Sequence, residues 1–314
     1  MDNLFIDTTD RQALSWNDVY DGTSTALEVT KAVATPQTVT NTDDRTLTAA
    51  TNIRDAAATA SPTGASWERI AYYRSVAPAQ ATGLTFLNSK GDEAVSGTFD
   101  TTFGNSLSYS SSDGTTCANQ STPFNGNLST SEIELIVMTD QVCSGDCDYY
   151  RPKSVAYHGW NGESKAFFIE FQMDHYNNTG NDLGAISDAP AWWFLNANIP
   201  RILQYGNDRN NKPCACWSYG CGEFDAFEVL EMGEVRAKST IHRQGNIQGG
   251  DSNYFLRPVG KTAKVAVVFY EYNITVSILD DSFDFSDTLT ASQIADIVTY
   301  DPNSNTDSLF TIGS

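Results

Sequence analysis

Residues 221–231 read CGEFDAFEVLE and place three acids, Glu223, Asp225 and Glu228, among apolar neighbours. Because successive side chains on a strand point to opposite faces, Glu223 and Asp225 share one face of the expected strand. Glu228 lies five residues after Glu223, an odd offset that would put it on the other face. One bulged residue at Ala226–Phe227 corrects the parity, so the stretch predicts a bulged strand with all three acids on one side.

Three acids on one face suit the retaining hydrolysis of a glycosidic bond, which needs two carboxyl groups about 5–5.5 Å apart. One attacks the anomeric carbon, and the other protonates the leaving oxygen and then activates water. A third acid between them separates the pKa values of the outer two. The outer Cα atoms would lie about 13 Å apart along a strand. A concave sheet and two long Glu side chains must therefore close the remaining distance.

The alternative interpretation is an acidic strand that faces solvent. With 39 Asp and Glu among 314 residues, a pattern of this kind arises by chance roughly 0.6 times in such a chain. Trp217 and Tyr219 before the acids, and Val229 and Leu230 after them, favour a site. The acid pattern by itself leaves both interpretations open.

Composition limits the class of ligand. The formal net charge is -20, the Lys and Arg residues number 19, and the sequence pI is about 4.3. Nucleic acids and anionic membranes require basic patches, so both are disfavoured as partners. A neutral polymer such as a polysaccharide is compatible with this charge.

The chain is expected to be all-β, because Thr, Ser, Asn, Asp and Gly are abundant and long helical patterns are scarce. Many short strands in a chain of this length predict a jelly-roll β-sandwich with a concave substrate cleft. A short helix is expected over 291–300. The expected strands lie at 67–73, 83–86, 97–103, 107–109, 132–138, 166–173, 191–195, 224–230, 236–242, 265–272 and 273–279.

Three regions are expected along the chain. Residues 1–12 read as an N-terminal tail, and residues 13–66 as a Thr/Ala-rich peripheral region or linker with too few apolar residues for its own core. Strand-like patterns begin at Trp67, so 67–314 is expected to form one β-sandwich catalytic domain.

The six cysteines and four N-glycosylation sequons predict a secreted glycoprotein with up to three disulfides. Among 15 possible pairings, the favoured set joins Cys143 to Cys147, Cys216 to Cys221 and Cys117 to Cys214. A zinc site built from these cysteines is the less favoured alternative, because their spacings do not match paired C-x-x-C ribbons. The sequons begin at Asn119, Asn127, Asn177 and Asn273.

Targeting signals are not evident. The first residues lack a basic-then-apolar leader, no apolar run approaches the roughly 20 residues that cross a bilayer, and the last residues carry no hydrophobic tail. These features are typical of a mature secreted chain with an added start. We expect a monomer that needs no cofactor and no metal.

Aromatic side chains that stack on the apolar faces of sugar rings are the candidate substrate-binding residues. Adjacent residues on a strand point to opposite faces, so at most one of Trp192 and Trp193 faces a cleft. Core packing is the simpler explanation for any single Trp. His242 ends the next strand and is either a cleft residue or a structural one. The candidates are Trp192, Trp193, Asn196, Arg201, Tyr205, Trp217, Tyr219 and His242.

Several motifs together resemble a known family. The chain has GNSLSY at 104–109, RPKSVAYHG at 151–159, PAWWFLNANIPR at 190–201, CACW at 214–217, GEFDAFEVL at 222–230, KSTIH at 238–242 and YFLRP at 254–258. This succession resembles the fungal cell-wall family named after the yeast Target of SBF protein. It is also similar to the core strands of glycoside hydrolase family 16 laminarinases. The resemblance covers roughly residues 67–275.

The resemblance implies a secreted or cell-wall endo-β-1,3-glucanase with Glu223 as nucleophile, Asp225 as helper and Glu228 as general acid/base. It also implies one of the adjacent tryptophans, together with Trp217 and His242, near the cleft. Two alternatives stay open: a β-glucan transglycosylase that uses the same site, and a non-catalytic glucan-binding wall protein.

Overall fold

The computed structural model describes residues 66–101, 105–128, 133–147, 150–162, 164–176, 187–197, 222–243, 246–251 and 254–312. Within these residues the elements are 17 strands and two short helices, which confirms the all-β class. Residues 1–65 lie outside this part of the chain. The three-region division of the sequence therefore stays a prediction.

The strands are β1 (Trp67–Glu68), β2 (Tyr72–Arg74), β3 (Gln80–Thr82), β4 (Leu84–Asn88), β5 (Ser108–Ser110), β6 (Cys117–Ala118), β7 (Ile136–Thr139), β8 (Lys165–Phe171), β9 (Ala191–Leu195), β10 (Glu223–Glu228), β11 (Arg236–Arg243), β12 (Asn246–Asp251), β13 (Phe255–Leu256), β14 (Ala263–Tyr270), β15 (Asn273–Leu279), β16 (Thr288–Leu289) and β17 (Asp307–Thr311). The helices are α3 (Glu93–Ser96) and α6 (Ala291–Ile297).

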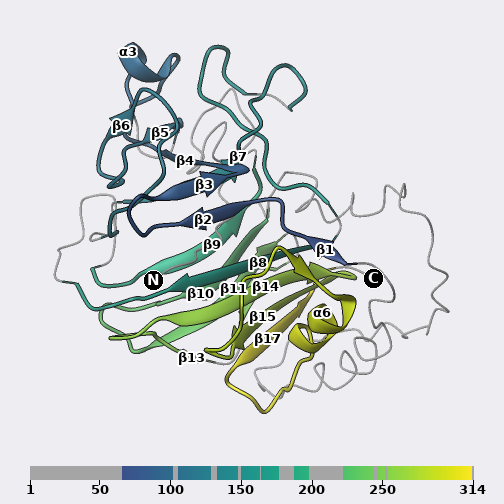
Figure 1. Cartoon of the computed structure of the whole chain (residues 1–314). Coiled ribbons are helices and arrows are strands. Elements are labelled where there is room, and N and C mark those ends of the chain that lie inside the picture. The colour runs from purple at the N-terminus through teal and green to yellow at the C-terminus, as the bar shows by residue number, and fades with distance from the viewer. Residues whose placement is uncertain are drawn as a thin grey trace.

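Two antiparallel sheets form the lower part of the molecule (Figure 1). One has the strand order β12-β11-β10-β9, with β13 also paired to β11, and the other has the order β17-β15-β14-β8. Their facing side chains share one core: Phe194 of β9 lies 5.1 Å from Phe167 of β8, and Phe224 of β10 lies 5.3 Å from Phe310 of β17, between ring centroids. Aromatic side chains of this size dominate core energetics, so these contacts hold the two sheets face to face.

The β14–β15 hairpin shows why one strand boundary was misplaced. Tyr270 pairs with Asn273, and the two residues between them, Glu271 and Tyr272, have φ values of 46° and 63°. This two-residue turn with positive φ matches the right-handed twist of the strands but usually carries Asn or Gly. The expected strand over 265–272 therefore ends at Tyr270, because no turn residue marked the end in the sequence.

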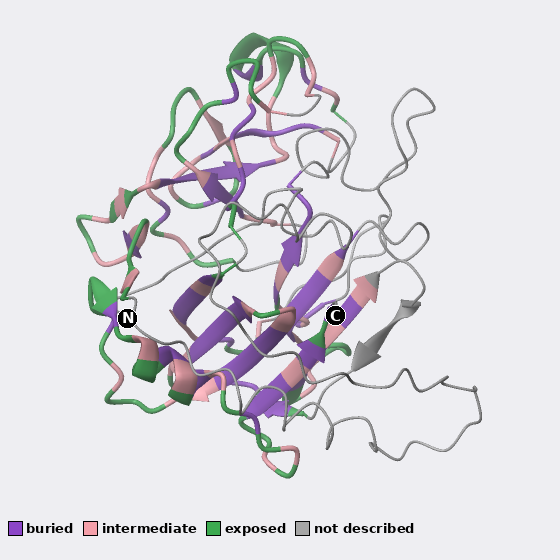
Figure 2. Cartoon of the chain, turned by 90° about the vertical axis from the view of Figure 1, so that its right-hand side faces the viewer, coloured by how far each residue is buried: buried purple, intermediate pink, exposed green. Residues whose placement is uncertain are grey.

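The outer face of the β17-β15-β14-β8 sheet is covered by a second apolar cluster. Ile294 and Ile297 of α6 pack there with Val268 of β14. Figure 2 shows that buried residues, in purple, run along most of the long strands. A capping box fixes the start of α6, since Thr290 accepts a hydrogen bond from the Gln293 N–H and Gln293 bonds back to the Thr290 N–H. This sheet is therefore buried on both sides.

A third antiparallel sheet, with the order β6-β5-β4-β7, lies above the other two in Figure 1. One expectation is wrong here: residues 97–101 form no strand, and Gly97 makes only an isolated bridge to Ser154. Just before this point α3 forms instead, because the Asp92 carboxylate caps it by accepting from the Ala94 and Val95 N–H groups.

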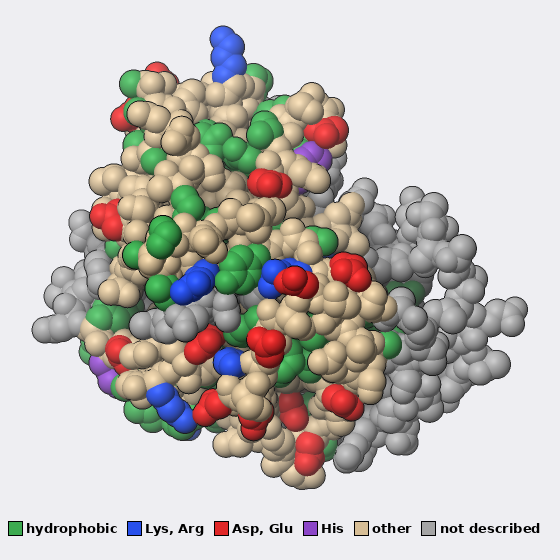
Figure 3. All heavy atoms as spheres, viewed as in Figure 1, with side chains coloured by type: hydrophobic (Ala, Val, Ile, Leu, Met, Phe, Trp, Pro, Cys, Tyr) green, Lys and Arg blue, Asp and Glu red, His purple; other side chains and the backbone are tan. Residues whose placement is uncertain are grey.

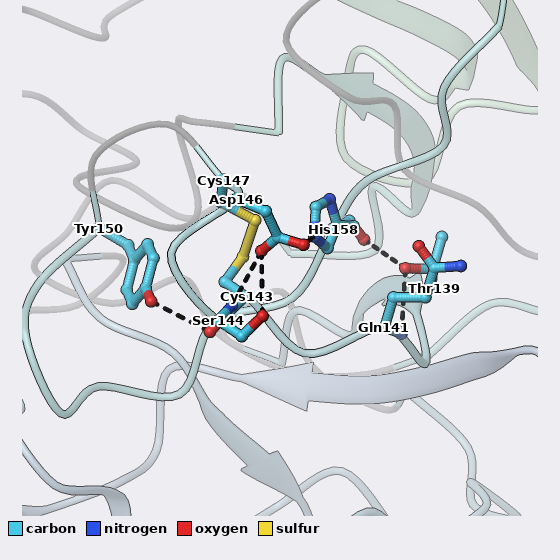
Figure 4. Close-up of a disulfide and its surroundings, with 8 residues drawn as sticks. All are labelled: Thr139, Gln141, Cys143, Ser144, Asp146, Cys147, Tyr150 and His158. Atoms are coloured by element: carbon cyan, nitrogen blue, oxygen red, sulfur yellow. Dashed lines mark hydrogen bonds and ion pairs between the residues drawn. A yellow bond between two sulfur atoms is a disulfide. The ribbon is translucent and has the colours of Figure 1, made fainter.

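The predicted disulfide between Cys143 and Cys147 is present, and it closes a short loop after β7 (Figure 4). This bond also removes both sulfur atoms from the zinc alternative. Cys117 is not bonded to any cysteine in the described residues, and its expected partner Cys214 lies outside them, as do Cys216 and Cys221.

A buried arginine ties three loops together. The Arg257 guanidinium, 2% exposed, donates to the backbone carbonyls of Met173, Asp174 and Glu234, and it pairs with the Asp188 carboxylate at 2.5 Å. The other Asp188 carboxylate oxygen lies 2.7 Å from Nδ1 of His175. Burial alone would raise the pKa of Asp188, but the hydrogen bonds from His175 and Arg257 outweigh it and hold the pKa below its ordinary value.

The surface agrees with the acidic composition. Asp and Glu side chains are scattered over the face seen in Figure 3, with isolated basic side chains between them. Neither of the two described helices is long and apolar enough to cross a membrane.

Candidate active site

The predicted bulge is present in β10, the strand that carries the acids. In the pairing with β11, Asp225 is opposite Thr240 and Glu228 is opposite Lys238. The two acids are three residues apart on β10, whereas their partners are two apart on β11. Ala226 and Phe227 together therefore oppose Ser239. Against β9 the register also shifts between Asp225 and Phe227. Two residues opposite one is the defining geometry of a β-bulge.

The bulge sorts the side chains of β10 by polarity. Phe224, Ala226 and Phe227 are all 0% exposed and belong to the core between the two sheets. An unbulged strand would send one of two adjacent apolar residues outward. Burial of both therefore favours the bulge, and the acids take the opposite face.

The side chains around the acids follow from strand register, because directly opposite residues lie on the same face of a sheet. His242 of β11 is opposite Glu223, Thr240 is opposite Asp225, and Lys238 is opposite Glu228. From β9, Trp193 is opposite Asp225 and Ala191 is opposite Glu228.

Asp225 lies at the centre of the group. Nε2 of His242 is 3.3 Å from Oδ2 of Asp225. One carboxylate oxygen of Glu223, one of Asp225 and one ring nitrogen of His242 all lie within 4.8 Å of one another. The candidate nucleophile, the middle acid and the imidazole are therefore in direct electrostatic contact.

The environment shifts the titration of two acids. Burial raises the pKa of Asp225, although His242 opposes this. Burial also raises the pKa of Glu228 to about 7, the negative charge of Asp225 adds to the increase, and His242 counteracts it. A carboxyl group that holds its proton to near neutrality has the property that a general acid requires.

The two adjacent tryptophans point in opposite directions, as expected. Trp192 is 8% exposed and packs in the core against Phe171 and Phe194, so its candidacy for substrate binding is not supported by its position. Trp193 is half-buried on the face of the acids, opposite Asp225.

The other candidate residues are distributed unevenly. Asn196 is 9% exposed, and its backbone N–H donates to the Gly222 carbonyl, which places it beside the start of the acid strand. Arg201, Tyr205, Trp217 and Tyr219 lie outside the described residues, so their proposed contacts with substrate stay predictions.

Three residues of this region were not identified from the sequence. Lys238 and Thr240 share the acid face with His242, as the alternation of side chains along residues 238–242 would have predicted. Tyr254 was missed because it is distant in sequence: Nζ of Lys238 lies 4.5 Å from its ring centroid, and Tyr254 is 42% exposed.

Among the described residues, two groups have ligand atoms close enough to hold a metal ion. Glu223, Asp225 and His242 form one, and Cys143, Cys147 and His158 form the other. The sulfur atoms of the second group are joined in the disulfide, and His158 instead approaches Asp146 at 3.2 Å (Figure 4). The first group coincides with the candidate catalytic acids.

A cavity of about 390 Å³ lies elsewhere in the molecule, beside the outer face of β8. Trp67, Phe168 and Phe285 contribute to its apolar lining, and none of the acids of β10 lines it. The candidate site is therefore defined by the acid-bearing face of β10 and not by this cavity.

The family model of the cell wall proteins YJL171C/Tos1, C-terminal part, matches residues 65–297. The chain belongs to the YJL171C/Tos1 family. The acid strand, the adjacent strands β9 and β11, and the Arg257 cluster all fall within the matched residues.

Relatives in the YJL171C/Tos1 family carry a common name. The chain is 39% identical over 227 residues to "Probable circularly permuted 1,3-beta-glucanase TOS1" of Saccharomyces cerevisiae, covering 71% of this chain and 47% of that protein. It is 41% identical over 240 residues to the Candida albicans protein of the same name, covering 74% and 49%. A protein of Arthroderma benhamiae named "Probable circularly permuted 1,3-beta-glucanase" is 36% identical over 253 residues, covering 76% and 54%.

The chain spans about half the length of these YJL171C/Tos1 relatives. No solved structure was found to match it.

Proposed function

We propose that the chain is a retaining endo-β-1,3-glucanase of the fungal cell wall. The observation that carries the proposal is the bulge in β10, which places Glu223, Asp225 and Glu228 on one face and leaves Glu228 with a pKa of about 7 beside Asp225. The names of the relatives support the choice of β-1,3-glucan as substrate.

The raised pKa decides the roles in the proposed double displacement. Glu228, protonated below about pH 7, gives its proton to the glycosidic oxygen as that oxygen leaves the anomeric carbon. The Glu223 carboxylate attacks the same carbon and forms a glycosyl ester. Glu228 then takes a proton from water, the water oxygen displaces Glu223 from the anomeric carbon, and the configuration is retained.

Asp225 and His242 have supporting roles in this scheme. Asp225 lies between the two glutamates in the strand and adds to the pKa of Glu228 through its charge. His242 lies within contact distance of Asp225 and opposite Glu223. We propose that it orients both carboxylates. Trp193, half-buried on this face, is the described aromatic side chain best placed to stack on a sugar ring.

The finer architecture and the location are also proposals. We propose that residues 67–314 form a jelly-roll catalytic domain in which the acid-bearing sheet is the floor of a concave cleft. Residues 13–66 are then peripheral. Secretion is supported by the disulfide, by the family of cell wall proteins and by the exposed sequon residues Asn119 and Asn127.

The test is product analysis on soluble β-1,3-glucan, with mixed-linkage glucan and chitin in parallel, for the native chain and for Glu223→Gln. The expected result is shorter oligosaccharides with retained anomeric configuration from the native chain and none from the variant. Products longer than the starting oligosaccharides would assign a transglycosylase. Equal glucan binding by both proteins with no products would replace the catalytic proposal with a glucan-binding role.

A further inference from the structure

The bulge of β10 has an internal support on the side away from the acids. Where Ala226 and Phe227 together oppose Ser239, Oγ of Ser239 donates to the Ala226 carbonyl at 2.6 Å. Ser239 is 0% exposed and lies on the core-facing side of β11, between Ala237 and Ile241. Removing the donor of a buried hydrogen bond is costly, so this bond stabilises the bulged conformation.

A second serine connects this bond to the opposite sheet. Oγ of Ser308, on β17, donates to Oγ of Ser239 at 3.2 Å, and Ser308 is 2% exposed. Two hydrogen bonds therefore run in series from β17 through Ser239 to the carbonyl of Ala226. They link the acid strand to the sheet that lies on the other side of the core.

The chemistry of the position sets Ser239 apart from its neighbours. On the same face of β11, Ala237 and Ile241 are apolar members of the core. An alanine would fill a similar volume at position 239 without burying a hydroxyl group. The buried hydroxyl has a partner within the bulge, the Ala226 carbonyl, to which it donates.

We propose that Ser239, held in place by Ser308, is a positioning residue for the reaction proposed above. It fixes the bulge, and the bulge sets Glu228 on the same face as Asp225 and close enough to feel its charge. Neither serine touches substrate, because both side chains lie in the core. This inference rests on the proposed function for its kinetic consequence but not for its structural one.

The kinetic test uses Ser239→Ala, Ser308→Ala and the double variant. A misplaced catalytic group lowers turnover by about ten- to a hundredfold, so we expect kcat of Ser239→Ala to fall by at least about tenfold while KM changes by less than about twofold. Ser308→Ala should lose less. The double variant should match Ser239→Ala, since Ser308 acts through Ser239.

Ser277→Ala is the matched control. Oγ of Ser277 also donates to a buried backbone carbonyl, that of Ile297 at 2.7 Å, and Ser277 is 7% exposed in the sheet that contains Ser308. It is expected to lose stability but to keep native kcat when assayed well below its melting temperature. An equal loss of kcat in this variant would overturn the proposal, because general destabilisation would then explain the effect.

A second readout does not depend on glucanase activity. Carboxyl carbon NMR follows the titration of Glu228, which the charge of Asp225 moves upward in the native protein. In Ser239→Ala the two carboxyl groups separate, so Glu228 should titrate at lower pH, whereas Ser277→Ala should titrate as the native protein does.

The two readouts separate the two proposals. If the native chain cleaves no glucan but Ser239→Ala lowers the titration of Glu228, the positioning role stands and the enzymatic proposal fails. An unchanged titration in Ser239→Ala overturns the positioning role, whatever happens to kcat. If Ser239→Ala does not fold, kcat and the titration of Glu228 are measured in Ser308→Ala instead, with the same criteria.

Discussion

At the scale of single residues, the raised pKa of Glu228 suits the proposed general acid but has a cost in stability. Its folded pKa of about 7 lies above the ordinary value of 4.5. The folded state therefore holds the proton more tightly than the unfolded state, and deprotonation disfavours folding as the pH rises from about 4.5 to 7. Above pH 7 this difference amounts to at most about 3 kcal/mol.

Replacing the titrating group tests this cost. Glu228→Gln should raise the free energy of unfolding at pH 8, by up to about 3 kcal/mol, because a neutral amide replaces a buried carboxylate. At pH 4 both proteins carry a neutral group, and the difference should shrink towards zero. Urea unfolding at the two pH values measures it. A stability difference that does not depend on pH would contradict the assigned pKa.

Asp225 contributes to the pH dependence of activity through its charge. In the proposed mechanism Glu228 must be protonated, so kcat should fall as the pH rises through about 7. Asp225→Asn removes the second largest cause of the raised pKa of Glu228 but leaves its burial. The fall of kcat with rising pH should therefore occur at lower pH than in the native protein, but still above the ordinary pKa of a glutamate. The pH profile of kcat on β-1,3-glucan checks this, and a limb that stays in place would exclude coupling between the two acids.

At the scale of elements, the sequence revealed the bulge but not its support. The five-residue spacing between Glu223 and Glu228 would put the two acids on opposite faces of a regular strand. That conflict alone predicted the extra residue that the structure shows between Asp225 and Glu228. Ser239 escaped notice, because a single Ser in a strand pattern resembles any other polar residue. Its role depends on Ser308, 69 residues away in the chain, and such long-range partners leave no local periodicity.

Turns and caps account for the misplaced elements. The β14–β15 turn is made by Glu271 and Tyr272, residues that seldom adopt positive φ, so no breaker marked it. At Asp92 a single N-cap began α3 immediately before the region where a strand was expected. The long strands β8, β10, β11, β14 and β15 were predicted correctly to within a few residues, since alternating apolar residues and a buried face agree there.

The disulfide loop after β7 is expected to contribute little to stability. Cys143 and Cys147 close a loop of only five residues, for which the chain-entropy model gives about 2 kcal/mol. Further bonds hold the same loop, including Tyr150 Oη to the Cys143 carbonyl and Ser144 N–H to Asp146 (Figure 4).

The double variant Cys143→Ala/Cys147→Ala should therefore lose no more than about 2 kcal/mol of unfolding free energy. It should also keep native kcat, because none of the described acid-face residues comes from this loop. Chemical denaturation and glucan hydrolysis measure the two quantities. A loss of activity without a loss of stability would place this loop at the substrate.

At the scale of the whole molecule, Arg257 and Asp188 join segments that are far apart in sequence. The ion pair links the loop after β8, the β10–β11 connection and the end of β13. Removing one partner of a buried pair leaves the other uncompensated, and this is strongly destabilising. The cluster therefore holds together the strands that flank the acids, at the end of β10 opposite to Gly222.

Asp188→Asn isolates the charge of this cluster. Asp188 has a φ of 51°, a conformation that Asn also tolerates, so the backbone should be unaffected. We expect a loss of about 2–4 kcal/mol at pH 6. Folding lowers the pKa of Asp188. The Asp188 carboxylate therefore contributes fully to the free energy of unfolding above the unfolded pKa of about 3.9. This contribution is lost as the pH falls through the lower pKa of the folded state.

The difference between native protein and Asp188→Asn should accordingly diminish below about pH 4. Unfolding free energies measured between pH 3 and pH 6 test the sign, with Asp280→Asn as the control. Asp280 also has a lowered pKa, but it is exposed, and the described hydrogen bonds of its carboxylate all come from Ser282. A constant difference across this range would show that the charge of Asp188 is not what stabilises the cluster.

Because of the bulge, the acid strand can have either two residues or one residue between Asp225 and Glu228 and still present the three acids on one face. Deleting Ala226 would leave the order Glu, Phe, Asp, Phe, Glu, in which strict alternation already puts the three acids on one side. A strand one residue shorter and a strand with an extra residue thus present the same acids outward. The acid-bearing strand is therefore a place where a codon can be lost while the three acids stay on one side, provided that position 239 loses its hydroxyl as well.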